Sequence, residues 1–413
     1  MAPEHRSTLS RPAGWQGLQK VAIVGAATLK GKELKETLED RNFPATEVLL
    51  FDDDDASGQL DVIRDEATFI HAVVRDSFDD VDVAFFASSE AFTLKTWKQA
   101  QKSGAAIVDL SYALEAERTL RVRSPWLDRE LTAREISSRA QGAQAGLTLG
   151  QHNFGQPGQP GQAGHAAPAA SPAATPAPTS AALPTLLPTL DIETTAVVCA
   201  HPAATILALL MVRLQKAGNI RTASATVFDP VSEQGTRGMD ELHQQTLNLL
   251  SFQSMPKDVY DMQIAFNMLS RYGEEAKASL EQVTDRVARH FTHLTRGKAP
   301  LPALQVLQAP TFHGHAISLY FEPETKTTAQ DLQAAIAGDH INLVSQDEDG
   351  PSNVTAAGQE DILVTLRADR NAGPSGDRGF WLWATGDNLK ISAITALECA
   401  MGLAAGRPSG KIQ

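Results

Sequence analysis

Two glycines near the start of the chain have the spacing of a loop that holds phosphate. The segment VGAATLKG, with Thr28 between Gly25 and Gly31, follows a short apolar run and precedes a helical pattern. Glycine there lets the backbone approach a pyrophosphate, and the helix N-terminus attracts its charge. The pattern predicts a dinucleotide site that includes Gly25, Ala26, Thr28 and Gly31.

An acidic run ends the next predicted strand. Phe51 is followed by four consecutive aspartates, Asp52–Asp55. A single acid at this place commonly binds the ribose hydroxyls of NAD, whereas four acids repel the 2′-phosphate of NADP. The alternative interpretation is a solvated acidic loop. NAD or NADP is therefore the expected cofactor class, with NADP disfavoured in either case.

Two histidines and two acids farther along could exchange protons with a ligand. They are His201, Asp229, Glu241 and His315. Imidazole and carboxylate groups are the usual general acids and bases. If the two histidines and Asp229 converge in space, hydrolysis or isomerisation becomes conceivable, and so does a bound metal ion. The sequence has no CxxC motif or Cys/His cluster, so no metal site is assigned from it.

The two cysteines, Cys199 and Cys399, are the candidate thiolates. Cys199 ends the apolar run VVC, and Cys399 lies in a helical pattern with Leu397 and Met401. A cysteine in apolar surroundings is usually a small packing residue. Neither cysteine is therefore expected to act as a nucleophile.

The elements that must position these residues fall into two α/β domains. Short apolar runs alternate with helical patterns over residues 20–122, which predicts a doubly wound parallel sheet of the Rossmann type. Strands outnumber helices over residues 192–385, which predicts an α+β domain with a large, mostly antiparallel sheet. The last segment, residues 386–413, contains an apolar-rich helix that is expected to complete the first domain.

Two segments lack an apolar period. Residues 1–19 are expected to be a flexible lead-in, and residues 123–191 an insertion. Within the insertion, residues 150–190 hold little but Gly, Pro, Ala, Gln, Ser and Thr. So few apolar residues cannot offset the entropy of ordering, which favours a disordered linker. A proline-rich docking segment is the alternative, but no PxxP pattern with flanking basic residues supports it.

Composition bounds the class of protein. The chain has 413 residues, 42% of them apolar, and a net charge of −13. The negative charge disfavours binding to nucleic acid or an anionic membrane. The sequence has no apolar run long enough to span a bilayer and no signal-peptide core near its start. We expect a soluble cytoplasmic protein with no nucleic-acid or membrane partner.

An ordered set of segments resembles the aspartate-semialdehyde dehydrogenase family. They are VAIVGAATLKGKEL, VDVAFFASSEA, GAAIVDLS, VVCAHPAATI, SEQGTRGMDELHQQT, PTFHGHAISLYFE and LWATGDNLKISAITAL. The resemblance implies a Rossmann-type NAD(P)-binding domain followed by an α+β dimerisation domain like that of glyceraldehyde-3-phosphate dehydrogenase. It also implies a homodimer.

The family reduces an acyl phosphate with NADPH, or runs the reverse, through a cysteine thiolate and a histidine. The resemblance places the cysteine position at Ala204, in the turn HPAA, and alanine cannot form a thioester. By the same resemblance, Glu115 replaces an arginine that grips phosphate and Gln308 an arginine that binds the substrate carboxylate. Asp229 replaces a glutamine near the substrate. These changes imply that the phosphorylating dehydrogenase reaction is lost.

Other positions match the family. His315 matches the catalytic histidine, Glu241 a glutamate that contacts substrate, and Asn388 the cofactor-side segment DNLK. Lys277 matches a lysine near the phosphate in a less secure alignment. The alternatives are a hydrogen-bonded histidine at a strand start for His315 and a solvated helix residue for Glu241.

Three functions follow from these residues. The first is a catalytically inactive homodimer retained for binding or regulation, in which Ala204, Glu115 and Gln308 line a chemically inert pocket for an unknown small molecule. The second is an active NAD(P)-dependent semialdehyde dehydrogenase of amino-acid biosynthesis. The third is different acid–base chemistry in the same cleft. The loss of the thiolate favours the first.

Overall fold

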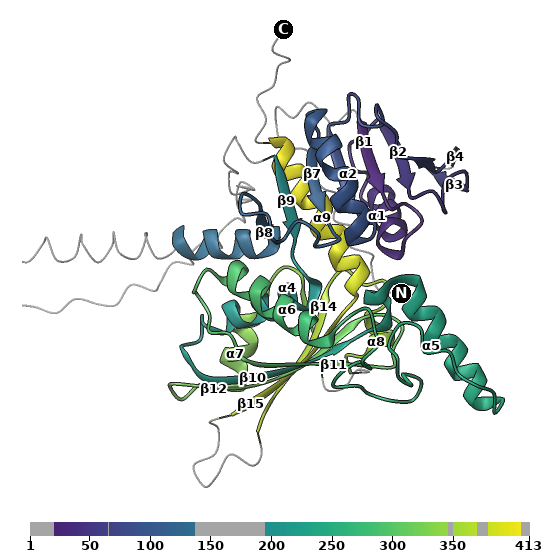
Figure 1. Ribbon diagram of the computed structural model, residues 1–413. Coiled ribbons are helices and arrows are strands. Elements are labelled where there is room, and N and C mark those ends of the chain that lie inside the picture. The colour runs from purple at the N-terminus through teal and green to yellow at the C-terminus, as the bar shows by residue number, and fades with distance from the viewer. Residues whose placement is uncertain (1–19, 65, 137–194, 346–349, 370–378, 406–413) are drawn as a thin grey trace, which may run out of the picture.

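The computed structural model describes residues 20–64, 66–136, 195–345, 350–369 and 379–405 (Figure 1). The expected lead-in and the expected linker lie outside the described residues, as do residues 406–413. In the described parts, two domains each contain one large sheet. No helix in these ranges is long and apolar enough to cross a membrane.

The first domain is built on a seven-stranded sheet in the order β5-β2-β1-β6-β7-β9-β8. Every neighbouring pair is parallel. The central strands are fully buried apolar runs, as expected of a parallel sheet covered on both faces. The strand bounds are β1 Lys20–Val24, β2 Glu47–Asp52, β5 His71–Ala72, β6 Val83–Phe86, β7 Ala106–Asp109, β8 Arg121–Arg123 and β9 Ala196–Cys199. A separate antiparallel pair joins β3 Leu60–Ile63 to β4 Glu66–Phe69.

The first sheet extends past the boundary expected at residue 192. β9 lies between β7 and β8 and is hydrogen-bonded in parallel to both. The boundary between the two sheets therefore follows β9, although the sequence analysis placed this strand with the second domain. In the sequence, the long insertion separates β9 from β7 and β8, its neighbours in the sheet. Local periodicity does not reveal which sheet such a strand joins. Residues 125–136, at the start of the expected insertion, form a helix.

Helices cover this sheet. Thr28 and Ser89 begin helices α1 Leu29–Asp40 and α2 Glu90–Lys102 by accepting backbone hydrogen bonds in the first turn. The C-terminal helix α9 Asn388–Ala405 packs against α1, β7 and β9. Figure 1 shows this last helix, in yellow, running alongside the first domain although it follows the second in the chain.

The second domain contains a six-stranded sheet in the order β11-β10-β12-β15-β14-β13. The central pairs are antiparallel, and each edge strand is parallel to its neighbour. The prediction of a mostly antiparallel sheet is confirmed. The strand bounds are β10 Ile220–Asp229, β11 Ala303–Gln308, β12 His315–Pro323, β13 Ile341–Leu343, β14 Ile362–Ala368 and β15 Phe380–Gly386.

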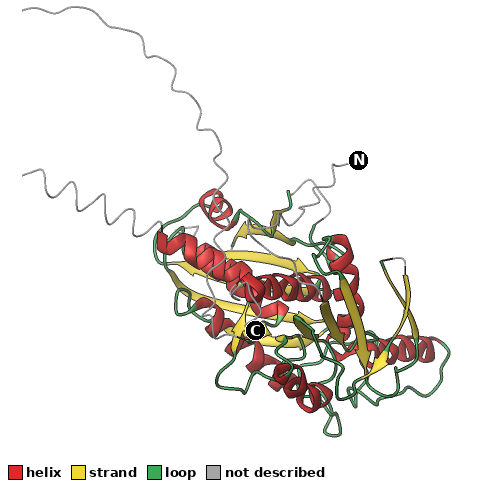
Figure 2. Cartoon of the chain, turned by 90° about the horizontal axis from the view of Figure 1, so that it is seen from above, coloured by secondary structure: helices red, strands yellow, loops and turns green. Residues whose placement is uncertain are grey.

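One face of this sheet carries a helical layer, visible from above in Figure 2. Every residue of α4 is buried, because the helix packs against α6, α7, α9 and β12. The helix bounds are α4 Pro202–Leu214, α5 Gly235–Leu250, α6 Leu280–Thr295, α7 Ala329–Ile336 and α8 Asn353–Ala356, with a short 3-10 turn η1 Val231–Gln234. The N-terminus of α4 follows β9 directly, so it lies at the junction of the two domains.

Candidate functional site

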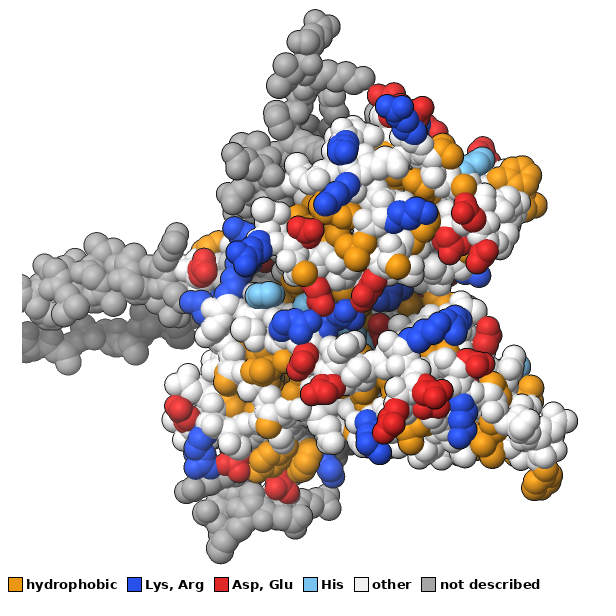
Figure 3. All heavy atoms as spheres, viewed as in Figure 1, with side chains coloured by type: hydrophobic (Ala, Val, Ile, Leu, Met, Phe, Trp, Pro, Cys, Tyr) orange, Lys and Arg blue, Asp and Glu red, His pale blue; other side chains and the backbone are white. Residues whose placement is uncertain are grey.

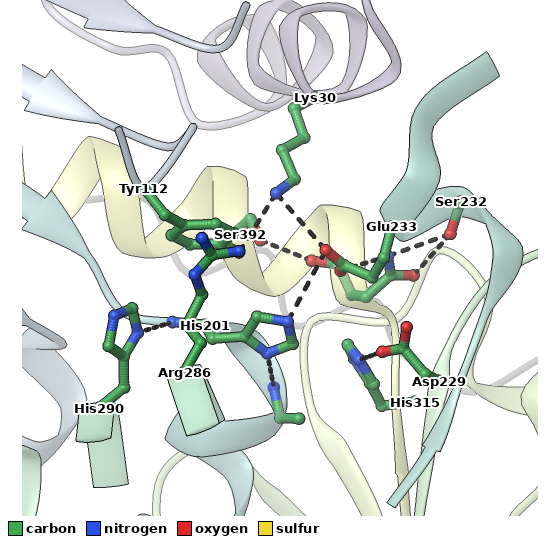
Figure 4. Close-up of polar contacts among 12 residues, drawn as sticks. Lys30, Tyr112, His201, Asp229, Ser232, Glu233, Arg286, His290, His315 and Ser392 are labelled. Atoms are coloured by element: carbon green, nitrogen blue, oxygen red, sulfur yellow. Dashed lines mark hydrogen bonds and ion pairs between the residues drawn. The ribbon is translucent and has the colours of Figure 1, made fainter. Parts of the chain in front are cut away.

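A buried polar cluster lies where the two sheets meet (Figure 4). β10 ends at Asp229 and the antiparallel strand β12 begins at His315. The register therefore places the two residues side by side, at the strand ends that face the first domain. His201 is the N-cap residue of α4. The topology therefore brings together three residues that are far apart in the sequence.

His315 and Asp229 form a buried pair. His315 Nε2 lies 2.9 Å from Asp229 Oδ1, and both side chains are fully buried. The other polar atoms of the pair, His315 Nδ1 and Asp229 Oδ2, have no hydrogen-bond partner among the described residues. Burial raises the pKa of the Asp229 carboxyl, although the hydrogen bond with His315 opposes this effect.

His201 completes the group that the third hypothesis required. Its ring packs edge-on against that of His315, with centroids 5.3 Å apart. One donor atom from each of His201, Asp229 and His315 lies within 4.8 Å of the others. Burial lowers the pKa of His201 well below its ordinary value, so the imidazole is neutral near pH 7.

Glu233 and Lys30 form an ion pair beside these histidines. Lys30 Nζ lies 3.5 Å from Glu233 Oε2, which is 3.9 Å from His201 Nε2. Burial alone would raise the pKa of Glu233, but the charge of Lys30 lowers it to about 2. Burial disfavours the charged form of Lys30 too, yet Glu233 and Tyr112 raise its pKa overall. Both groups are therefore ionised.

Tyr112 fills the space between the two domains. Its ring stacks on His201, with centroids 5.5 Å apart, and its hydroxyl lies 3.2 Å from Lys30 Nζ. The Arg286 guanidinium lies 4.9 Å from the ring centroid. Tyr112 has a φ of 66°, which is uncommon for a bulky residue and persists only where the surroundings hold it.

Glu115 joins the two domains through an ion cluster. Its carboxylate contacts Arg286 Nε at 3.3 Å, Arg289 at 3.0 Å and His290 Nε2 at 3.0 Å, all on α6. His290 Nδ1 accepts a hydrogen bond from the His201 backbone N–H, so Nε2 carries the proton that faces Glu115. Figure 3 shows basic and acidic side chains gathered along the line where the domains meet.

No thiol accompanies the cluster. Ala204 lies fully buried in the first turn of α4. Both cysteines lie in the apolar core of the first domain, Cys199 on β9 and Cys399 on α9. Burial and a hydrogen bond with Cys399 raise the pKa of the Cys199 thiol well above its ordinary value, which disfavours the thiolate.

Two other residues singled out from the sequence, Gln308 and Glu241, form hydrogen bonds with backbone groups. The Gln308 amide is fully buried; it accepts from the Tyr272 hydroxyl at 2.6 Å and donates to the Asp229 carbonyl at 2.7 Å. Glu241 on α5 is buried rather than solvated, and its carboxylate accepts a hydrogen bond from the Val259 backbone N–H at 2.6 Å. Its role as a substrate contact stays a prediction.

The glycine loop between β1 and α1 packs tightly against its surroundings, and its role in binding a nucleotide stays a prediction. Gly25 has a φ of +93°, and a Cβ there would collide with the Ser88 backbone. A Cβ on Gly31 would collide with the Gly25 carbonyl, so β1 and α1 pack as closely as a phosphate loop requires. The buried Asp52 carboxylate accepts from the Ala27 N–H at 2.8 Å and thus braces the loop.

Asn388 lies at the start of α9 and is fully buried. Its amide oxygen accepts from the Gly314 N–H at 2.9 Å, and its amide nitrogen donates to Glu233 Oε1 at 2.8 Å. These bonds tie α9 to the second domain. The expected contact of Asn388 with a cofactor stays a prediction.

Comparison with known families decides what this architecture is. Residues 20–144 match the semialdehyde dehydrogenase NAD-binding domain, and residues 212–391 match the semialdehyde dehydrogenase dimerisation domain. Together the two matches cover more than half of the chain. The chain belongs to the aspartate-semialdehyde dehydrogenase family. The predicted family and fold class are thereby confirmed.

Relatives match along most of their length. The chain is 24% identical to a USG-1 protein homolog of Azotobacter vinelandii and 24% identical to an aspartate-semialdehyde dehydrogenase of Rickettsia conorii. Each match covers 92% of this chain and 96% of the relative. A solved structure of a probable aspartate-semialdehyde dehydrogenase from Pseudomonas aeruginosa has a TM-score of 0.70 at 22% identity, covering 93% of this chain and 98% of that chain.

Sequence patterns missed several residues of the site in this family member. Lys30 and Glu233 carried no motif of their own, and Tyr112 was not singled out. The acid at position 115 was the one sequence feature that could have indicated partners such as Arg286 and His290, because a half-buried carboxylate needs polar or charged partners beside it. Their positions in the sequence gave no indication of that contact.

Proposed function

We propose that this chain is a dimeric member of its family that does not catalyse phosphorylating dehydrogenation and is retained for binding or regulation. The observation that carries this proposal is Ala204, at the helix N-terminus where the resemblance places the nucleophile. A thioester requires a thiolate within reach of the hydride acceptor. Cys199 and Cys399 lie instead in the first domain's core.

The two positions that the family resemblance assigns to substrate-binding arginines support the same proposal. The Glu115 carboxylate repels phosphate, and its cationic neighbours Arg286 and Arg289 are already paired with it. The Gln308 amide is saturated by protein hydrogen bonds. Neither position therefore offers a free cation to an acyl phosphate.

For the cofactor we propose NAD rather than NADP. The glycines pack β1 closely against α1, and the N-terminus of α1 is the place where a pyrophosphate would bind. Asp54 and Asp55 are exposed just beyond β2, where their charge disfavours a 2′-phosphate. Calorimetric titration with both oxidised nucleotides checks this preference, and tighter binding of NADP would contradict it.

For the assembly we propose a homodimer through the second sheet. The sheet face away from α4 and α6 presents Trp381 and Trp383 around a hollow also lined by Ser318 and Arg367. Trp381 retains 37% of its surface, which is unusual for a large aromatic side chain. Sedimentation velocity should show a dimer that Trp381→Lys weakens. A wild-type monomer at micromolar concentration would reject the interface.

The activity proposal is tested by nucleotide reduction. The purified full chain is mixed with aspartate semialdehyde, phosphate and either NAD or NADP, and absorbance at the reduced-nicotinamide band is followed. The Rickettsia conorii relative is assayed in parallel as the positive control. We expect no phosphate-dependent signal from this chain. Phosphate-dependent turnover by the wild type, persisting in a Cys199→Ala/Cys399→Ala variant or not, would overturn the proposal.

A second candidate is acid–base chemistry at the same junction. The convergence of His201, Asp229 and His315 within 4.8 Å is the observation that favours it. Hydrolysis of an activated ester is a simple probe for such a group. Ester hydrolysis by wild type that His315→Gln abolishes would support this candidate. Equal hydrolysis by wild type and His315→Gln would reject it.

A further inference from the structure

We infer that His201, Asp229 and His315 form a binding site for one divalent first-row transition-metal ion. The three side chains come from the N-cap of α4, the end of β10 and the start of β12. All three are buried. Figure 4 shows them meeting at the domain junction, with Glu233 beside them.

The spacing of the donor atoms fits a common ion. One donor from each residue lies within 4.8 Å of the other two. Zinc binds imidazole nitrogen and carboxylate oxygen at about 2.0–2.2 Å, so in tetrahedral coordination two ligand atoms lie about 3.3–3.6 Å apart. The donor atoms therefore need to approach one another by at most about 1.5 Å.

Unpaired atoms point to a ligand at this place. Asp229 Oδ2 and His315 Nδ1 are buried without a hydrogen-bond partner among the described residues. Buried polar side-chain atoms are nearly always paired, and a bound ion is one recognised explanation for an exception. A cation would supply the partner that the Asp229 carboxylate lacks.

The surrounding charges permit a cation. Lys30 is the nearby positive group, but it is paired with Glu233 at 3.5 Å. The Asp229 carboxylate is paired instead with the imidazole of His315. Binding through His201 Nε2 would move the ring proton to Nδ1 and break the 3.3 Å contact from the Ala203 N–H. That contact is long, so its loss is small beside a metal–nitrogen bond.

The donor set selects the class of ion. Two imidazoles and one carboxylate suit Zn²⁺, Co²⁺ or Fe²⁺, whereas Ca²⁺ and Mg²⁺ prefer oxygen alone. Three protein ligands leave one coordination position for water or a small molecule. This inference does not depend on the proposed loss of dehydrogenase activity, because metal binding is measured without turnover.

The test uses the full chain after treatment with a chelator. Equilibrium dialysis with Zn²⁺ measures the stoichiometry, and titration with Co²⁺ gives visible absorption bands that report nitrogen and oxygen ligands in a low-symmetry site. We expect about one bound ion per chain, with affinity at least about tenfold weaker in His315→Gln and Asp229→Asn. His313→Gln, a partly exposed histidine two residues away, is the matched control and should bind like wild type.

A third variant guards against misfolding. His201→Asn removes the imidazole but keeps a side chain favoured at a helix N-cap, so α4 should form normally. Circular dichroism and thermal melting verify the fold of each variant, and Zn²⁺ should raise the melting temperature of wild type and of His313→Gln more than that of the three ligand variants. Absence of a stoichiometric ion in wild type would overturn the inference. Binding that all three ligand variants retain would overturn it as well, because it would belong to surface histidines.

Discussion

The ring of Tyr112 lies stacked on the ring of His201, with centroids 5.5 Å apart. One residue follows the strand β7 of the first domain and the other begins α4 of the second. Lys30 reaches the same ring from the glycine loop, at 4.3 Å from its centroid. Tyr112, His201 and Lys30 therefore contact one another across the domain junction, and the effects of substituting them on the free energy of unfolding should not be additive.

The first prediction concerns the buried ion pair of Lys30 and Glu233. Lys30→Met removes the cation and leaves a buried carboxylate, so the free energy of unfolding should fall by about 3 kcal/mol. The double variant Lys30→Met/Glu233→Gln should be more stable than Lys30→Met alone, because no unpaired charge remains. Urea unfolding gives the free energy of unfolding of wild type, Lys30→Met, Glu233→Gln and the double variant. Strictly additive losses would show that the two residues are not coupled.

The second prediction is a pH dependence from Glu115. Burial alone would raise the pKa of this carboxyl, but the hydrogen bond with His290 and the charge of Arg286 lower it from 4.5 to about 2. A pKa that is lower in the folded state stabilises the protein above pH 4.5 and loses that effect as the pH falls towards 2. After allowance for solvent screening, we expect about 1 kcal/mol.

Thermal melting between pH 5 and 3 checks this contribution. Glu115→Gln should be less stable than wild type near neutral pH, and the difference should shrink as the medium becomes acidic. Glu117→Gln is the matched control, since Glu117 lies two residues away with an exposed side chain. A constant difference across the range would assign the effect to packing rather than to charge.

The third prediction concerns the thiols. Cys199 and Cys399 are both buried in the core of the first domain. A disulfide reagent that releases a coloured thiolate should therefore leave the native protein unreacted and label both cysteines after unfolding in guanidinium. A fast reaction in the native state would identify an activated thiol and reopen the possibility of covalent catalysis.

The fourth prediction separates close packing from backbone strain in the glycine loop. Gly25→Ala adds a Cβ against the Ser88 backbone at a φ of +93°, and should cost about 3 kcal/mol or more of stability. Gly104→Ala, at a φ of +86° with open space around it, should cost only about 1 kcal/mol. Chemical unfolding compares the two. Equal losses would mean that the loop adapts to the added methyl group.

Sequence patterns predicted the architecture well because the strands of each domain show a hydrophobic pattern that depends only on neighbouring residues. Buried parallel strands appear as apolar runs such as residues 21–24, and half-buried strands alternate, so both sheets could be expected. The placement of β9 could not, since it depends on a pairing across the long insertion. Its four residues are equally compatible with either sheet.

The candidate site was partly predictable for the same reason. His201, Asp229 and His315 lie at strand or helix ends, where the topology of an α/β protein gathers side chains. Lys30, Tyr112 and Glu233 belong to the site only because of how the two domains sit against each other. That relation involves contacts between residues far apart in the sequence, as between Lys30 of the first domain and Glu233 of the second, and no local pattern encodes it.

The ion cluster around Glu115 also constrains how this protein can change. Glu115→Arg alone would set a guanidinium beside Arg286 and Arg289, where like charges repel, and would leave His290 Nε2 without its carboxylate partner. An arginine at this position is therefore compatible with the fold only if α6 changes at the same time.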